Sequence, residues 1–302
     1  MKKLSGVPAL ILCALLWSSG GLLVKFVHYN SFAIAGVRSF IALCFLMISL
    51  RKWPKFVIYS DEEESQDKAP DAFKATHKRS VDREKTRDLW LAGITYALTM
   101  TFYILGNKLT TAANTIILEY TGPLYIIMFG PAILGEKNRV SDYVTSVGVI
   151  AGMVLLMSDG LSTGNHLGNF LAALSGVSFG FSTIFMRKLR GDNSENAFML
   201  SHIINVVLWS PFIFMAGIPD ILSIAGLLLR GVFQNGIPSI LYSRGLDKVP
   251  ALTGSFISMI EPLMNPVWVF LATGECPSIL ALIGGVLIIG FVTMRGAVQK
   301  KG

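Results

Sequence analysis

The sequence predicts an all-α membrane protein with ten transmembrane helices arranged as two inverted five-helix repeats. Three observations lead to this prediction. The 302-residue chain is 52% hydrophobic and 15% charged, with a mean hydropathy of +0.58, which is too apolar for a soluble globule. Ten segments are long and apolar enough to cross a hydrocarbon layer of ~30 Å. One of these segments recurs later in the chain, which indicates that the protein was built twice from one plan.

The ten predicted spans follow one another with short connections, apart from one long polar interval. The first run is longer than the ~7–15 apolar residues of a secretory signal, and further spans follow, so we interpret it as a transmembrane helix. Alignment of the repeats favours starting the eighth helix at Arg230 and leaving Ile221–Leu229 as an interfacial piece. To within a few residues, the spans lie at 6–27, 31–50, 89–106, 111–134, 141–158, 167–186, 196–216, 230–246, 249–273 and 278–295.

The internal repeat is clearest where Ala112–Glu136 returns as Ala251–Glu275, at a constant offset of 139 residues. Each copy is a long apolar segment with a proline near its middle, Pro123 or Pro262, which we expect to break the helix. We assign residues 1–158 to the first repeat and 159–302 to the second. The offset aligns Tyr103 with Tyr242, Gly106 with Gly245, Ala112 with Ala251, Pro123 with Pro262, Gly135 with Gly274, and Glu136 with Glu275.

Five spans in each half mean that the second half enters the membrane in the opposite orientation to the first. This construction lets one binding site near the midplane open to either side in turn, and it is common among secondary transporters. If the N-terminus is cytoplasmic, 22 of the 26 Lys and Arg residues lie on the cytoplasmic side. The outer side receives only Lys25, Lys108 and Arg230, and Arg38 lies inside a span. This asymmetry predicts a multi-pass protein of the plasma membrane with both termini in the cytoplasm.

The interval from Arg51 to Asp88 is the long polar region of the chain. Its low hydrophobicity and mixed charge predict a solvated, flexible cytoplasmic loop. A tolerated insertion is the simpler interpretation, and a regulatory or lipid-headgroup contact is the alternative.

Ionisable side chains inside the predicted spans are the first candidates for function, because a charge at the bilayer centre costs at least ~2.5–3.5 kcal/mol. Glu261 precedes Pro262, which removes a backbone donor and leaves carbonyl groups free. Glu261 can therefore take up a proton, or it can brace the bend through a hydrogen bond. Glu119 lies one turn before Pro123 on the same face, where it either lines a cavity or pairs with Arg38.

Polar and aromatic residues at membrane depth predict a cavity for a polar organic molecule. For each of them, packing or interfacial anchoring is the alternative. These residues are Trp17, Asn114, Tyr120, Tyr125, His202, Asn205, Gln234, Asn235, Asn265 and Trp268. Small residues expected at close helix contacts are Gly148, Gly152, Gly176, Gly180, Gly285 and Gly290.

Enzyme signatures are missing from the sequence, including the phosphate-binding loop, H-E-x-x-H and G-x-S-x-G. The four histidines are isolated, and the three cysteines have no metal-ligand spacing. We therefore expect no enzyme, no cofactor and no metal, and energy for transport from a gradient. The basic residues lie between apolar runs and form no stripe, which argues against nucleic-acid binding.

The motifs resemble the EamA-type branch of the drug/metabolite transporter superfamily over essentially the whole chain. The resemblance is carried by Pro123 to Gly135-Glu136 and by Glu261-Pro262 to Gly274-Glu275. It extends to Trp17, Arg38 and Thr110-Thr111-Ala112-Ala113. The chain departs from the family pattern at Gly122-Pro123, at Glu119 and Cys276, and in the loop 51–88. The resemblance implies a carrier, often an exporter, of amino acids or related small metabolites that is coupled to protons.

We therefore expect a secondary transporter that works by alternating access on a small-molecule substrate in the lipid bilayer. Glu119 and Glu261 are expected to handle a proton or cation, and Arg38 to act as counter-charge or anion contact. The expected cavity lining is Tyr120, His202, Asn265 and Trp268. A passive channel, or a membrane interaction protein acting through the loop 51–88, are the alternatives.

Overall fold

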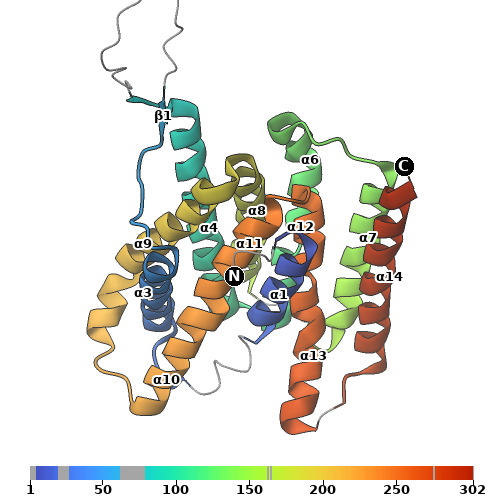
Figure 1. Ribbon diagram of the computed structural model, residues 1–302. Helices are drawn as coiled ribbons and strands as arrows, with labels where there is room; N and C mark the ends of the chain where they lie inside the picture. The colour runs from blue at the N-terminus through green and yellow to red at the C-terminus, as the bar shows by residue number, and fades with distance from the viewer. Residues whose placement is uncertain are drawn as a thin grey trace, which may run out of the picture.

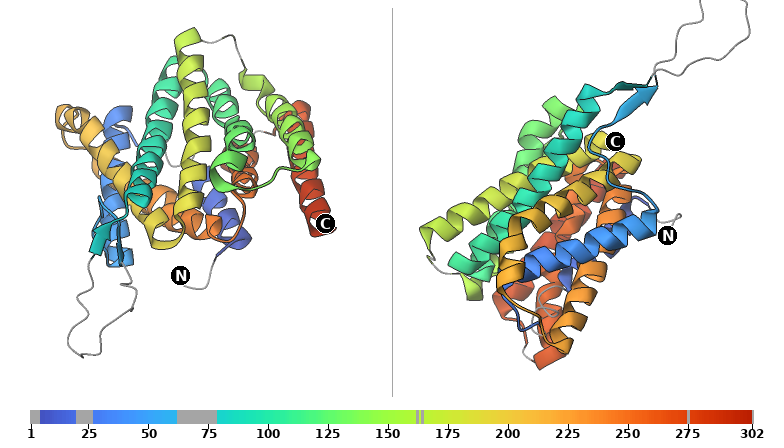
Figure 2. Two further views of the ribbon diagram at one scale, coloured as in Figure 1. Left: turned by 90° about the horizontal axis from the view of Figure 1, so that it is seen from above. Right: turned by 90° about the vertical axis from the view of Figure 1, so that its left-hand side faces the viewer.

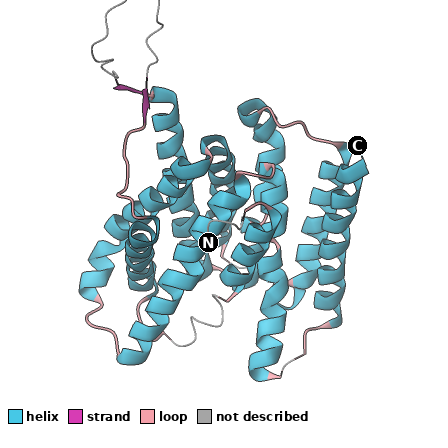
Figure 3. Ribbon diagram, in the orientation of Figure 1, coloured by secondary structure: helices cyan, strands magenta, loops and turns pink. Residues whose placement is uncertain are grey.

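The computed structural model describes residues 5–19, 27–61, 79–161, 163, 165–274 and 276–301, without the side chains of residues 61, 79, 192, 265, 269, 272, 273 and 299–301. The described chain is mostly helical (Figures 1 and 3). A π-helix, Arg230–Gly236, joins α10 to α11, and a 3-10 turn, Ser158–Gly160, follows α7. The α-helices are α1 Val7–Ser18, α3 Ser31–Leu50, α4 Arg83–Leu109, α5 Ala112–Glu119, α6 Gly122–Leu134, α7 Val140–Leu156, α8 His166–Leu189, α9 Gly191–Met215, α10 Ile221–Leu229, α11 Ile237–Leu246, α12 Ala251–Ser258, α13 Ile260–Thr273 and α14 Ile279–Lys301.

Seven helices in the described part of the chain are long and apolar enough to cross a membrane. Two shorter apolar helices are α1 and α7. Large apolar side chains face outward, including Ile48, Val147 and Val286 with 77%, 68% and 71% of their surface exposed. Such exposure is rare over broad areas of soluble proteins and suits contact with lipid tails. The seven spans are Ser31–Leu50, Arg83–Leu109, Ala112–Leu134, His166–Leu189, Asn193–Met215, Ile221–Leu246 and Ile279–Val298.

Several helices begin at a residue whose side chain accepts a hydrogen bond from the first turn. This contact satisfies one of the backbone N–H groups that a helix start leaves without a partner. The backbone N–H of Lys85 donates to Asp82, and this bond holds the pKa of the Asp82 carboxyl below its usual value. The capping residues are Asn30 for α3, Asp82 for α4, Thr111 for α5, Asn165 for α8 and Asp220 for α10.

The predicted start of the eighth span at Arg230 is wrong. Asp220 caps α10, and the helix then continues from Ile221 through the π-helix to Leu246 without a break. No proline or turn sequence interrupts the chain at Leu229. The wide turn of the π-helix begins at Arg230, so the arginine lies within the continuous helix. Arg230 therefore lies inside a span with 7% of its surface exposed, and its assignment to the outer aqueous side is also wrong.

The predicted first span is also shorter than expected. The helix α1 ends at Ser18, residues 20–26 lie outside the described chain, and Val27 is not helical.

The prediction of a solvated loop from Arg51 to Asp88 holds for the irregular segment 51–58 and is wrong for Tyr59–Asp61 and from Arg79 onward. Strands β1 (Tyr59–Asp61) and β2 (Arg79–Val81) form an antiparallel pair, and α4 begins at Arg83. The segment between α3 and β1 is bound to α9, because the Asn196 side chain forms two hydrogen bonds with the backbone of Lys55, at 2.7 and 2.6 Å. Figure 2 shows the strand pair projecting from one end of the bundle. Residues 62–78 lie outside the described chain.

The helices pack as neighbouring pairs. α4 lies along α8, α3 along α9, and α7 along α14 (Figure 1). The glycine prediction holds for Gly148 and Gly152, which lie against side chains of α14. It fails for Gly290, whose added Cβ would meet no atom within 4 Å. At Gly285 an added Cβ would make only ordinary contacts, the nearest at 3.6 Å.

Candidate functional site

Both copies of the repeated segment are broken helices, and the breaks lie at matching positions. In the first copy α5 ends at Glu119 and α6 begins at Gly122. In the second copy α12 ends at Ser258 and α13 begins at Ile260. Each proline lies in the first turn after its break. The backbone N–H that proline lacks would have no partner within the helix at this position, so its absence costs little. The carboxylates are placed differently, because Glu119 precedes its break whereas Glu261 follows the other.

The break in the first copy rests on a glycine face of α8. A Cβ at Gly176 would lie 2.9 Å from the carbonyl oxygen of Glu119, and one at Gly180 would lie 2.8 Å from that of Gly122. Larger residues would separate the two backbones, so these glycines permit the close approach. The Thr121 hydroxyl donates to the Leu118 carbonyl at 2.6 Å, which satisfies one of the groups released by the break.

Tyr120 joins the two breaks. Its hydroxyl lies 2.9 Å from Oε2 of Glu261 and 3.2 Å from the carbonyl oxygen of Ser258, and it can donate its proton to either. Tyr120 itself is buried, with 6% of its surface exposed. Tyr120, the residue that directly follows α5, is therefore within hydrogen-bonding distance of residues on both sides of the second break.

Glu119, Glu261 and Arg38 form a charged cluster that is only partly buried. Glu119 is close enough to both Glu261 and Arg38 for their charges to interact. Within the described chain, however, no ion pair within 4.0 Å joins Glu119 to Arg38, and the Nε of Arg38 is buried without a hydrogen-bond partner. The sequence leaves two alternatives for Glu119, a salt bridge with Arg38 or a place in a cavity wall. This structure does not contain that salt bridge.

His202 and Trp268 occupy separate places. His202 is fully buried, with Nε2 3.5 Å from the Ser239 hydroxyl and Nδ1 without a partner in the described chain. It lies within electrostatic range of Arg38. The indole N–H of Trp268 donates to the Ser18 hydroxyl at 2.9 Å, which ties α13 to α1. The side chain of Asn265 lies outside the described residues.

Arg230 is the residue that the sequence reading missed. Its Nε donates to Oε1 of Gln234 at 3.0 Å, and its Nη1 is buried with no partner among the residues that the structure describes. It begins the π-helix, a wide turn that is frequent at functional sites. The available signal was an arginine between Leu227–Leu229 and Gly231–Phe233, inside an apolar run with no helix breaker.

The upper end of the bundle in Figure 1 carries a second set of charges, and these are paired. Gly135 ends α6 with a left-handed φ of 69°, so the chain turns and Glu136 reaches the second repeat. Oε2 of Glu136 accepts the backbone N–H of Ala251 at 3.0 Å, at the start of α12, and Oε1 pairs with Arg187 at 2.9 Å. Arg187 also donates to the carbonyl of Leu246, so the end of α6, α8 and the connection before α12 are fastened together.

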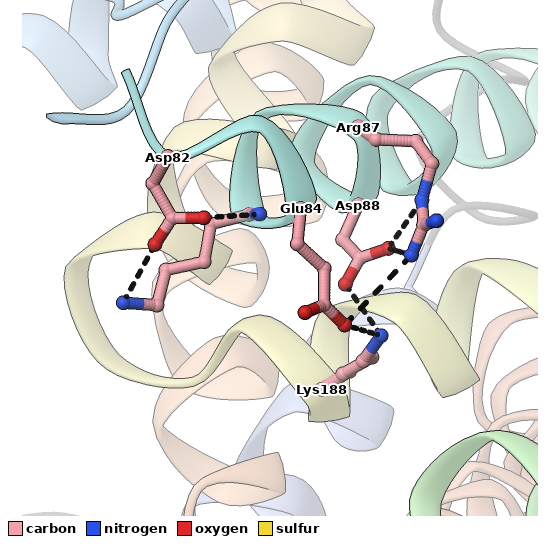
Figure 4. A network of polar contacts seen from close by, with 6 residues as sticks. Asp82, Glu84, Arg87, Asp88 and Lys188 are labelled. Carbon is pink, nitrogen blue, oxygen red and sulfur yellow. Dashed lines mark hydrogen bonds and ion pairs between the residues drawn. The ribbon is translucent and has the colours of Figure 1, made fainter. Parts of the chain in front are cut away.

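Further ion pairs lie at the same end. Figure 4 shows Lys188 of α8 at 2.8 Å from carboxylate oxygens of both Glu84 and Asp88 on α4. Arg295 and Asp142 pair at 2.6 Å with 5% and 4% of their side chains exposed. Among the described residues, no group of three or more His, Cys, Asp and Glu side chains is placed to hold a metal ion.

These features define a multi-pass helical membrane protein that contains a duplicated, broken helix. The model of the EamA-like transporter family matches residues 4–158 and 166–295, and the chain belongs to that family. The resemblance seen in the sequence motifs is thereby confirmed.

The chain is 25% identical over 220 residues to the uncharacterized transporter YwfM of Bacillus subtilis, covering 70% of this chain and 74% of that protein. It is 24% identical over 216 residues to an uncharacterized transporter of Archaeoglobus fulgidus, covering 71% and 77%. Identity to the pseudopaline exporter CntI of Pseudomonas aeruginosa is 23% over 216 residues, covering 70% and 75%. One solved crystal structure superposes with a TM-score of 0.74 over 97% of each chain at 16% identity, which supports the fold alone.

Proposed function

We propose that this protein is a secondary transporter that moves amino acids or related small metabolites across the plasma membrane, in the direction of export and coupled to protons. The observation that carries the proposal is the cluster of Glu119, Glu261 and Arg38. These charges lie at membrane depth, are only partly buried and are not closed into ion pairs. Charges in this setting are costly, and in transporters they mark ion and substrate pathways. The similarity to a protein named as a pseudopaline exporter supports export of a small metabolite.

The arrangement of the repeats supports alternating access. In Figure 1 α6 ends at the upper end of the bundle, whereas α13 ends at the lower end, as expected for inverted repeats. The concentration of Lys and Arg at the upper end supports a cytoplasmic location for that end. Glu136 and Arg187 then fasten the two repeats together on the cytoplasmic side. Opening toward the cytoplasm requires these contacts to separate, while the Tyr120 contact between the two breaks keeps the centre aligned.

Proton coupling is assigned to the two carboxylates. Protonation of Glu119 or Glu261 removes a charge from an apolar setting and changes the attraction to Arg38, so the protonation state biases one conformation over the other. The Tyr120 hydroxyl stabilises the charged form of Glu261, because it donates a hydrogen bond to that carboxylate. Glu119 has no such donor among the described residues, and it is the carboxylate we expect to change its protonation state during transport.

The test is transport by purified protein in liposomes, after a metabolite panel has identified a cargo by thermal stabilisation. We expect saturable counterflow, and accumulation against a concentration gradient when a pH gradient is imposed. Glu119→Gln should abolish the gradient-driven accumulation without unfolding the protein. Glu84→Gln, at an exposed glutamate, serves as the matched control and should retain both activities.

Two outcomes would contradict the proposal. Equal uptake by the Glu119→Gln variant with and without the gradient, matching the unmodified protein, would remove the coupling role of Glu119. Flux without saturation or counterflow would indicate a passive channel.

A further inference from the structure

Two arginines at membrane depth each have a guanidinium nitrogen that finds no partner among the described residues, and the two come from different elements. Arg38 lies on α3, with its Nε buried and unpaired. Arg230 begins the π-helix, has 7% of its surface exposed, and keeps Nη1 buried and unpaired. The two elements are in direct contact, because a Cβ at Gly231 would meet the side chain of Ile41 and lie 3.2 Å from the carbonyl oxygen of Arg38.

The two guanidinium groups are close enough for their charges to interact. Arginine stays charged under all ordinary conditions, so this arrangement concentrates two positive charges in an apolar setting. The groups around the two arginines offset only part of this positive charge. Tyr103 lies within electrostatic range of both arginines, and Glu119 within range of Arg38, yet neither forms an ion pair or hydrogen bond with them in the described chain. Gln234 accepts one bond from Arg230 but carries no charge.

A third unpaired polar atom belongs to the same neighbourhood. Nδ1 of His202 on α9 is fully buried without a partner, and His202 also lies within electrostatic range of Arg38. Helix α9 packs along α3, and His202 contacts Ser239 of α11, one turn after the π-helix. Buried polar groups in proteins nearly always have partners, so several unsatisfied groups in one place indicate that a partner is supplied from outside the chain.

We propose that Arg38 and Arg230 together bind an oxyanion, the carboxylate or phosphate group of the molecule that the protein carries, with His202 alongside them. Guanidinium groups match such oxyanions because their N–H donors form paired, charge-assisted hydrogen bonds. The inference rests on the proposed transport function and narrows its substrate to an anionic class. Glu119 then handles the proton while the arginines hold the cargo, and the separation of these roles makes the two proposals testable apart.

The experiment measures thermal unfolding of the purified protein in nanodiscs of neutral phosphatidylcholine. Succinate, glutamate and inorganic phosphate are titrated at constant ionic strength, with glutamine as the uncharged counterpart of glutamate. We expect at least one anion to raise the unfolding temperature with saturation and glutamine to have no such effect. Arg38→Gln and Arg230→Gln should each raise the half-saturating concentration at least tenfold. Arg83→Gln, an exposed arginine at the start of α4, should leave it unchanged.

Without ligand, the two variants are expected to unfold at the same temperature as the unmodified protein or at a higher one, because each removes an uncompensated charge. If either variant folds poorly, Arg38→Lys and Arg230→Lys preserve the charge but lose the paired donors, and they should also weaken the anion effect. Unfolding temperatures lowered by the substitutions without any change in anion response would show that the arginines are structural, and would overturn the proposal.

Three other results would also overturn it. Equal stabilisation by anions in all variants would indicate the general effect of excluded salts. A response to glutamine equal to that of glutamate would remove the need for charge. Arginine-dependent stabilisation by phosphatidylglycerol alone, with no response to soluble anions, would assign the site to a lipid headgroup. Loss of proton coupling in Glu119→Gln bears on the transport proposal only, and the anion response of that variant should be preserved.

Discussion

Several charges at the upper end of the bundle form ion pairs, whereas in the part of the chain that the structure describes none of the central charges does. Arg295 with Asp142, Arg187 with Glu136, and Lys188 with Asp88 all form ion pairs between 2.6 and 2.9 Å. At the centre, Arg38, Arg230 and His202 each keep a nitrogen atom that has no partner among the described residues.

This contrast separates two kinds of charge. We expect the paired charges to stabilise the fold and the central charges to take part in binding or transport. In a buried ion pair, each charge offsets part of the cost of removing the other from water. Removal of one partner therefore lowers the stability of the fold. An unpaired charge contributes nothing favourable to the folded state, so its presence has to be explained by something that binds or moves. The following experiments test that division, from the largest expected effect to the smallest.

The Arg295–Asp142 pair should be the most sensitive to substitution, because both side chains are at least 95% buried. Asp142→Asn leaves the arginine buried without a counter-charge, which should lower the free energy of unfolding by ~3–5 kcal/mol. Unfolding in detergent, followed by tryptophan fluorescence, measures the loss. The double variant Asp142→Asn with Arg295→Gln should recover most of it, and a single variant as stable as the unmodified protein would contradict the structural role.

Tyr120→Phe removes the one hydrogen bond that Glu261 receives from the described residues. Glu261 and the Ser258 carbonyl lose their donor, which should cost ~1–3 kcal/mol. The same unfolding measurement applies, with Tyr125→Phe, an aromatic one turn further along α6, as the control. If the charge of Glu261 depends on this bond, the pH dependence of transport should also shift toward that of a more readily protonated carboxylate. An unchanged unfolding free energy would show that the bond does not stabilise the centre.

Glu136→Gln weakens the fastening between the repeats at the upper end. The amide keeps the size of the side chain but loses the charge that faces Arg187 and the start of α12, at a site one quarter exposed. We expect a loss of ~1–2 kcal/mol. Cross-linking of cysteines introduced near residues 136 and 251 measures the separation of the two repeats, and it should become less efficient in the variant. Equal cross-linking in both proteins would argue against a closing role for this contact.

Glu84→Gln should have the smallest effect. Glu84 is 67% exposed, and Lys188 keeps its second partner, Asp88, when this one is lost. Exposed ion pairs contribute ~0–1 kcal/mol, and we expect less than ~0.5 kcal/mol here. Asp88→Asn, at the buried partner of the same lysine, gives the comparison and should cost more. If Glu84→Gln lowered the free energy of unfolding more than Asp88→Asn does, burial would not determine which ion pairs stabilise the fold.

Much of the fold could be anticipated from local patterns. The membrane class follows from the apolar runs, and the broken helices from two prolines embedded in repeated segments. The repeat alignment places the start of the eighth span at Arg230, whereas the cap at Asp220 and the apolar run after it start α10 at Ile221.

For the candidate site, sequence reasoning singled out Glu119, Glu261 and Arg38 because ionisable residues stand out in apolar segments. It did not single out Arg230, because the repeat alignment places this residue at the start of the eighth span and its charge on the outer side. It also could not choose between a Glu119–Arg38 salt bridge and a cavity, since both are compatible with the same spacing along a helix.

Composition, hydrophobic run length and the 139-residue repeat by themselves determined that this is a duplicated membrane protein with a proline near the middle of each copy, because these are properties of short stretches of chain. Only the tertiary structure decided that Tyr120 reaches Glu261, 141 residues away, and that Glu136 holds the start of α12. It also decided that Nε of Arg38 and Nη1 of Arg230 have no partner among the described residues. Pairing between distant side chains depends on how the helices pack against one another, and the periodicity of a single helix carries no record of its neighbours.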